Sequence, residues 1–393
     1  MIAMHYAAIL AGAFCLAFTP IYDEDEVPDY TLPDPLILEN GDSVDDAETW
    51  FDQRRPEILE LFREHVYGRR AGPPEAVEFE IIEEDAGAMD GEATLKRVAI
   101  RSVQGENSHT FELVLFIPND TSGPAPVFLL MNNRGASNTD PTREQKSGFW
   151  PAEEVIERGY AIAAFQVSDV APDSADRFRE GAVSLFEDPE EEREPDGWGA
   201  LAAWGWGASR VMDYFEADDA VDASRAALAG HSRGGKASLW AGAEDERFAM
   251  VVSNNSGCGG AALFRRRFGE RITLLNDVRP HWFCVNHRQF NGREDALPVD
   301  QHMLIALSAP RAVYVASASE DRPADPRGEF LAALHAGPVF ELLGAQPLPA
   351  GEMPEPGEPV HGTVGYHIRE GRHNLTPEDW HHFMDFADMH FTR

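Results

Sequence analysis

The stretch that decides the fold is Ala226-Ala-Leu-Ala-Gly230-His231-Ser232-Arg233-Gly234-Gly235-Lys236. A short apolar run ends at the pattern Gly-x-Ser-x-Gly, and the residues that follow, 236–243, favour a helix. A strand, a sharp turn and a helix in this order make a serine at the turn an exposed nucleophile. Strand and helix approach closely there, so small residues must flank the serine, and Gly230 and Gly234 meet that need.

Ser232 is expected at the amino end of the following helix, where backbone N–H groups and the helix dipole stabilise developing negative charge. The alternative interpretation is a glycine-rich connection that carries a serine by coincidence, because short motifs also match by chance. The order of strand, turn and helix favours the catalytic interpretation.

The rest of the chain contains two kinds of apolar segment. Alternation of apolar and polar residues predicts antiparallel strands over 77–83, 93–100 and 111–118. Short runs with few charges predict strands buried on both faces, at 127–131, 161–165, 226–229, 250–253 and 311–316. Helical segments such as 200–214 and 377–389 lie among or after these runs. The pattern predicts an α/β fold, a three-layer αβα sandwich with a mostly parallel sheet and antiparallel N-terminal strands.

The domain organisation follows from the same pattern. We expect a catalytic domain over residues 96–393 and, packed on it, an N-terminal extension over residues 21–95. Within the extension, residues 45–67 have helical spacing, and Pro56 suits the first turn of a second helix. Residues 178–197 are acidic and rich in turn residues, which predicts a surface loop or lid.

Composition restricts the class of protein. A hydrophobic share of 43% describes a globular chain, and a formal net charge of −35 argues against nucleic acid and anionic membranes as partners. We expect a monomer that needs no cofactor and no metal. His281, Cys284 and His287 come nearest to a metal-ligand cluster, but a closed zinc site needs four ligands at tighter spacing.

The N-terminus resembles an export signal. Residues 7–18 have the length of a signal-peptide apolar region and are too short to span a bilayer, so we predict a signal peptide over residues 1–20 and an exported protein. No Lys or Arg precedes the run, and a buried N-terminal helix is the alternative. Removal of Cys15 with the leader leaves Cys258 and Cys284 as one possible disulfide, which the sequence does not decide.

A serine nucleophile needs a histidine base and a carboxylate, and in a fold of this kind they follow the serine in the order acid, then base. His373 is the candidate base among 14 histidines, because it lies in a polar, glycine-containing loop before the last predicted helix. The candidate acids follow the strand at 311–316. Asp321 is preferred over Glu320 and Asp325, and Asp325 is also suited to cap the next helix.

Developing charge on the substrate oxygen needs hydrogen-bond donors. The backbone N–H of Arg233 is one candidate, and the loop Asn132-Asn133-Arg134-Gly135 is the other. The guanidinium of Arg233 either faces that oxygen or a substrate carboxylate, or it pairs with one of the 68 acidic residues.

Several stretches resemble the bacterial branch of the glucuronoyl esterases, carbohydrate esterase family 15. They include Gly230-His-Ser-Arg-Gly-Gly-Lys236, Ser253-Asn-Asn-Ser-Gly257 and His281-Trp-Phe283, and they extend through residues 300–311 and 315–330. The resemblance implies an exported, cofactor-free serine esterase of the α/β-hydrolase fold. The implied substrates are esters of 4-O-methyl-glucuronic acid, either in glucuronoxylan linked to lignin alcohols or as small uronate esters.

The resemblance also implies roles for individual residues. Ser232 corresponds to the nucleophile, His373 to the base and Arg233 to the oxyanion stabiliser. Lys236, Glu270 and Trp282 correspond to substrate-binding positions.

Two departures from the family pattern affect the interpretation. The family's acid occupies one of two places, which here hold Asn255 and Asp321, so Asp321 must act alone in an active enzyme. Pro323 stands where many relatives have a tryptophan. The alternatives are therefore an acetyl-type carbohydrate esterase on the same scaffold, or a weakened hydrolase that binds polysaccharide. The basic run Arg265-Arg-Arg267 either attracts acidic xylan or forms a solvated helix face.

Overall fold

The computed structural model describes residues 20–391, and the predicted signal peptide lies outside this range except for Pro20. The described residues form one ten-stranded sheet in the order β1-β2-β3-β5-β4-β6-β7-β8-β10-β9. The strands are β1 (Ala76–Ala88), β2 (Ala93–Gln104), β3 (Asn107–Pro118), β4 (Ala125–Asn132), β5 (Ala161–Gln166), β6 (Val221–His231), β7 (Met250–Asn254), β8 (Ala312–Ala318), β9 (Val360–His361) and β10 (Val364–Arg369).

The sheet is antiparallel at one end and parallel through its centre, as predicted. Strands β1, β2 and β3 pair antiparallel, and β3 pairs antiparallel with β5. From β5 through β4, β6, β7 and β8 to β10, every pairing is parallel. The predicted strands are all present. Sequence periodicity missed β9 and β10, because β10 contains a histidine and an arginine although all of its residues are buried.

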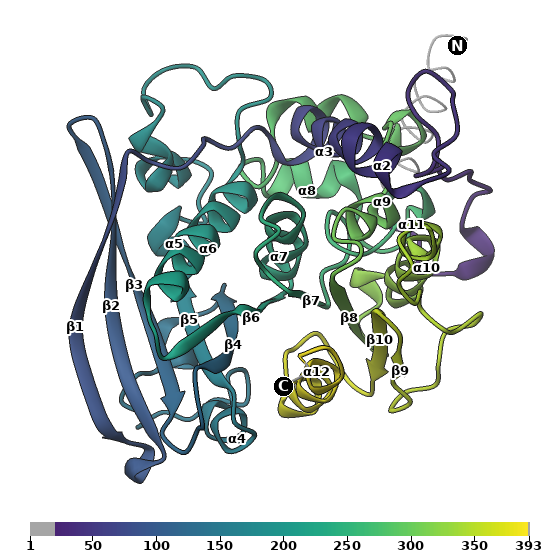
Figure 1. Cartoon of the computed structure of the whole chain (residues 1–393). Coiled ribbons are helices and arrows are strands. Elements are labelled where there is room, and N and C mark those ends of the chain that lie inside the picture. The colour runs from purple at the N-terminus through teal and green to yellow at the C-terminus, as the bar shows by residue number, and fades with distance from the viewer. Residues whose placement is uncertain (1–19, 392–393) are drawn as a thin grey trace, which may run out of the picture.

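Helices cover both faces of the sheet (Figure 1). Side chains of β4 alternate between two cores, since Leu129 and Met131 belong to one cluster and Phe128 and Leu130 to the other. The principal helices are α4 (Ala152–Glu157), α5 (Val167–Val170), α6 (Ala200–Ala217), α7 (Arg233–Glu244), α8 (Ile272–Val278), α9 (Gln301–Ala306), α10 (Pro326–His335), α11 (Gly337–Leu342) and α12 (Pro377–His390). Helices α4 and α12 contribute to the second core and α6, α7 and α9 to the first, which confirms the three-layer α/β-hydrolase architecture.

The N-terminal part packs on the helix that follows Ser232. A helical run formed by α2 (Ala47–Thr49), a π-helical turn, α3 (Arg55–Phe62) and a second π-helical turn ends at Tyr67. The ring of Tyr67 stacks on Trp240 of α7 with centroids 4.6 Å apart. The predicted boundary between the N-terminal extension and the catalytic domain, at residue 95, lies inside β2, and β1 is the edge strand of the same sheet. This domain boundary stays a prediction.

In the acidic segment over 178–197, most residues from 188 to 195 are exposed, whereas Phe178, Ala182, Val183 and Leu185 are buried in two short 3₁₀ turns. Within residues 20–391, no helix is both long enough and apolar enough to cross a membrane.

Candidate active site

The turn between β6 and α7 holds Ser232 in an unusual backbone conformation, with φ 56° and ψ −127°. Such a conformation is costly for a residue with a side chain and is retained only where the surroundings enforce it. The backbone N–H of Ser232 donates to the carbonyl of Asn254 at 2.8 Å. A Cβ at position 230 would lie 2.1 Å from the carbonyl oxygen of Gly234, so glycine at this position permits the close approach of strand and helix.

The candidate base and acid meet directly. His373 lies in the loop between β10 and α12, and its Nδ1 is 2.6 Å from Oδ2 of Asp321, which follows β8. The Asn255 amide also donates to Oδ2 of Asp321, at 3.0 Å. Asp321 is 4% exposed, whereas the His373 side chain is 43% exposed. A buried carboxylate therefore holds one nitrogen of a solvent-facing imidazole and leaves Nε2 free to exchange protons.

The rival carboxylates are engaged elsewhere. Glu320 pairs with Arg372 on the surface. Asp325 caps α10 by accepting from the Gly328 N–H, and it also pairs with the buried Arg266 at 2.8 Å. These contacts favour Asp321 among the three candidates.

The Arg233 side chain reaches across the site to Asp173, a residue that the sequence analysis did not identify. Its Nε lies 2.8 Å from Oδ2 of Asp173, and its Nη2 donates to the Asn133 carbonyl at 2.7 Å. Asp173 also accepts from His281 Nε2 and Trp282 Nε1, each at 2.8 Å. Burial opposes ionisation of Asp173, but these two hydrogen bonds and the charge of Arg233 outweigh it and lower its pKa to about 2. Asp173 follows β5 and the short helix α5, and this position beyond the carboxyl end of a parallel strand was the available signal.

Lys236 and Glu270 also meet. Lys236 is 2% exposed, and its Nζ donates to the carbonyls of Ser256 and Cys258 at 2.5 and 2.7 Å and to Oε2 of Glu270 at 3.3 Å. The Trp282 ring centroid is 5.9 Å from the same Nζ. The three residues assigned to substrate binding therefore form one group, in which the buried ammonium holds a partly exposed carboxylate.

Both interpretations of the basic run are wrong. Arg265 and Arg266 are 5% and 3% exposed, so they neither attract a polysaccharide nor form a solvated helix face. Arg265 pairs with Asp300, and Arg266 pairs with Asp325 and Glu24. Burying these arginines requires such partners, and the run serves to join loops of the fold.

Cys258 and Cys284 do not form a disulfide. The thiols of Cys258 and Cys284 are both free and buried. The Nδ1 atom of His287 lies 3.0 Å from Oδ1 of Asn276, and Nε2 of His281 lies 2.8 Å from Oδ1 of Asp173. In the part of the chain that the structure describes, no group of three or more His, Cys, Asp or Glu side chains is placed to hold a metal ion.

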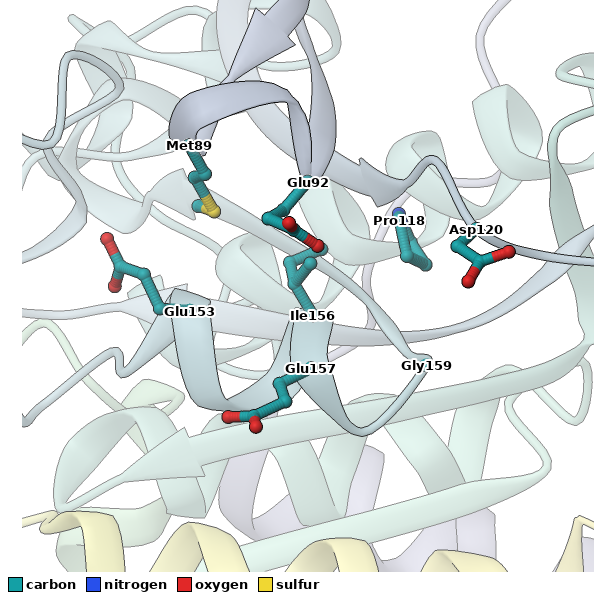
Figure 2. Close-up of a pocket in the computed structure, with 8 residues that line it drawn as sticks. All are labelled: Met89, Glu92, Pro118, Asp120, Glu153, Ile156, Glu157 and Gly159. Atoms are coloured by element: carbon teal, nitrogen blue, oxygen red, sulfur yellow. The ribbon is translucent and has the colours of Figure 1, made fainter.

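A pocket of about 460 Å³ lies at the opposite edge of the sheet and is lined by Met89, Glu92, Pro118, Asp120, Glu153, Ile156, Glu157 and Gly159 (Figure 2). Asp120 and Gly159 precede β4 and β5, whereas Ser232 and Asp321 follow the ends of their strands. The lining residues include four carboxylates and no serine, cysteine or histidine. This pocket therefore has no nucleophile and is unsuited to an acidic ligand.

Comparison with known proteins identifies the family. The family model described as glucuronyl esterase, fungi, matches residues 100–344. The chain is 42% identical to carbohydrate esterase MZ0003 from an unknown prokaryotic organism, over 94% of this chain and 92% of that protein. It is 27% identical to a 4-O-methyl-glucuronoyl methylesterase from Podospora anserina, over 72% of this chain and 54% of that protein, and so spans about half of that relative.

Solved structures agree with the sequence comparison. The glucuronoyl esterase from Solibacter usitatus superposes with a TM-score of 0.89 at 41% identity, covering 94% of this chain and all of that one. The family match covers more than half of the chain, and the identity to carbohydrate esterase MZ0003 extends along nearly all of it. This chain is an ester hydrolase that belongs to the glucuronoyl esterase family, carbohydrate esterase family 15.

Proposed function

We propose that the protein hydrolyses esters of glucuronic acid and 4-O-methyl-glucuronic acid through a Ser232–His373–Asp321 triad. The contact that carries this proposal is the 2.6 Å hydrogen bond between His373 Nδ1 and Asp321 Oδ2, beside a serine in a strained strand-to-helix turn. The ring of His231, the residue before Ser232, lies 4.5 Å from the His373 ring, so base and nucleophile belong to one site.

The triad works in two steps. Nε2 of His373 takes the proton of the Ser232 hydroxyl as its oxygen attacks the ester carbonyl. The same nitrogen then gives that proton to the departing alcohol as its bond to the carbonyl carbon breaks, and the uronoyl group remains esterified to Ser232. Water, activated by His373, hydrolyses this acyl-enzyme and releases the free acid. Asp321 fixes the tautomer of His373 and stabilises the imidazolium that forms in both steps.

Charge that develops on the carbonyl oxygen falls beside Arg233. Its backbone N–H lies at the first position of α7, where the helix dipole adds to the attraction. The Arg134 N–H on the neighbouring loop already donates to Oδ1 of Asn132 at 3.0 Å, so we assign the principal role to Arg233.

The substrate class is supported by the polar group next to the turn. A uronate ring presents several hydroxyls, and the partly exposed Glu270 offers acceptors for them, while the largely buried Trp282 packs beside Lys236. Lys236 uses its three N–H groups on protein oxygens, so we assign it the role of holding Glu270 in place. We further propose that the protein is exported, needs no cofactor and acts as a monomer on glucuronoxylan or small uronate esters.

A paired ester assay tests the substrate. The wild-type protein is expected to release alcohol from the methyl and benzyl esters of glucuronic acid and to release little acetate from acetylated xylan. Ser232→Ala is the matched control and should lower turnover by about a million-fold. Faster release of acetate than of either alcohol would reassign the protein as an acetyl esterase. Polysaccharide binding without turnover of any ester would identify a binding protein.

A further inference from the structure

Asp379, at the start of α12, makes more hydrogen bonds than a helix cap needs. Its Oδ2 accepts from the N–H and the hydroxyl of Thr376, at 2.8 and 2.7 Å, which completes a capping box. The same carboxylate also accepts from Arg369 Nε at 2.9 Å, His367 Nε2 at 3.0 Å and Asn254 Nδ2 at 3.1 Å. Asp379 has no solvent exposure, so these contacts offset the cost of burying its charge.

Arg369 holds the loop that carries His373. Arg369 Nη1 donates to the carbonyl of Glu370 at 3.0 Å. Its Nη2 donates to the carbonyls of Arg372 and Asn374, at 2.9 and 2.6 Å. The two residues on either side of His373 are therefore fastened to one buried guanidinium, whose own direction is set by Asp379.

Asn254, another partner of Asp379, forms a hydrogen bond with His231, the residue before the nucleophile. Oδ1 of Asn254 lies 2.6 Å from Nδ1 of His231, which places the His231 proton on that nitrogen. Nε2 of His231 then accepts from Arg134 Nη2 at 3.2 Å, and Arg134 Nη1 donates to Oδ1 of Asn374 at 2.8 Å. The contacts close into a ring around the base loop, in the order Asp379, Arg369, Asn374, Arg134, His231, Asn254 and back to Asp379.

We propose that Asp379 is a positioning residue for His373 and that it acts through this closed ring of hydrogen bonds. The inference rests on the proposed role of His373 as the base. The His373 side chain is 43% exposed, and among residues 20–391 its only side-chain hydrogen bond is to Asp321, so packing alone does not fix its direction. The ring supplies the constraint by fixing the backbone on both sides of the histidine and the neighbouring His231 ring.

His231, the ring member beside His373, stays uncharged. Burial, followed by repulsion from His373 and Arg134, lowers the pKa of His231 well below its usual value. A neutral His231 leaves the imidazolium of His373 without a cationic imidazole beside it during turnover.

The test compares two substitutions at the start of the same helix. Asp379→Asn keeps the side-chain shape but removes the charge that orients Arg369, and we expect kcat to fall about 100-fold with KM nearly unchanged. Thr376→Ala weakens the helix cap and removes one hydroxyl donor to Asp379, but it leaves the carboxylate charge beside Arg369, so it should lower Tm and leave kcat within about twofold. Equal losses of kcat in the two variants, or a loss of Tm alone in both, would overturn the proposal.

A second variant covers the case in which Asp379→Asn does not fold. Arg369→Lys keeps a positive charge beside Asp379 but cannot reach three carbonyls at once, so kcat should fall about tenfold at constant KM. Unchanged kcat in Arg369→Lys would contradict the proposal.

A substrate-independent measurement separates this inference from the proposed function. The rate at which an alkyl fluorophosphonate labels Ser232 depends on the base but not on a sugar-binding site. We expect Asp379→Asn to slow labelling and Thr376→Ala to leave it unchanged. If the wild-type protein is labelled but hydrolyses no uronate ester, the proposed substrate fails and the role of Asp379 is still decided by the labelling rates.

Discussion

Asp321 is the residue on which the proposed chemistry depends most. Its Oδ2 receives two donors, His373 Nδ1 at 2.6 Å and Asn255 Nδ2 at 3.0 Å. The other position at which the resemblance places an acid therefore holds an amide that donates to the proposed acid. Asn255 has a left-handed backbone, with φ 46°, and this conformation directs its amide toward Asp321.

Substitutions at these two positions should separate the acid from its neighbour. Asp321→Asn removes the charge that stabilises the His373 imidazolium, and we expect kcat to fall about 10³- to 10⁴-fold. Asn255→Ala removes one donor and leaves the Asp321–His373 contact in place, so the loss should stay below about tenfold. Steady-state kinetics on methyl glucuronate measures both. Near-wild-type kcat in Asp321→Asn would show that another group serves as the acid.

At the scale of elements, the turn between β6 and α7 depends on the absence of a side chain at Gly230. The space that a Cβ would need there is taken by the backbone of Gly234 and Gly235. Backbone atoms at this distance cannot move aside as a flexible side chain would, so strand and helix would have to separate.

Gly230→Ala is therefore expected to lower the free energy of unfolding by at least about 3 kcal/mol, the upper part of the range for overpacking. Gly72→Ala is the matched control, since no atom lies within 4 Å of a Cβ at that position, and its effect should stay within about 0.5 kcal/mol. Urea denaturation of both variants provides the comparison. Equal stability of the two would mean that the turn adapts to a side chain.

At the scale of the whole molecule, buried titratable groups make stability depend on pH. Burial lowers the pKa of His287 to about 3, and burial is also the main cause that lowers the pKa of His302 to about 4. Both imidazoles are neutral when folded and gain a proton on unfolding below about pH 6.5. Burial raises the pKa of Glu329 to about 8, against hydrogen bonds from Ser317, Gly257 and Ser256, so this carboxyl keeps its proton in the folded chain and loses it on unfolding.

Burial also lowers the pKa of His231 and that of His382, the latter to about 4, so four histidines gain protons on unfolding. Their protons outnumber the one that Glu329 loses, so stability should fall as the pH falls from about 7 to about 5. Between about pH 7 and pH 8 the Glu329 effect dominates, and stability should fall as the pH rises. Urea denaturation across this range measures both limbs. Glu329→Gln should flatten the alkaline limb and His302→Gln should make the acidic limb less steep; limbs unchanged by these substitutions would contradict the assignment.

Patterns of neighbouring residues in the sequence were sufficient to predict most strands of the fold. Period-two alternation, uncharged apolar runs and the Gly-x-Ser-x-Gly turn depend on residues close together in the chain, and they predicted eight of the ten strands among the described residues. The same local reasoning placed His373 after the last buried strands and Asp321 after β8, where the structure brings the two side chains into contact.

The sequence by itself thus determined the layered sheet, the strained turn and the identities of the candidate triad. Only the tertiary structure decided which charges are buried together. Asp173 meets Trp282 from 109 positions away, and Asn254 meets Asp379 from 125 positions away. Distant partners also explain why Arg265 and Arg266 are buried and why β10 was missed. In β10, the charge of Arg369 is neutralised by a carboxylate on another element. A local pattern measures hydrophobicity along the chain, whereas a buried charge is stabilised by a partner that only folding brings within reach.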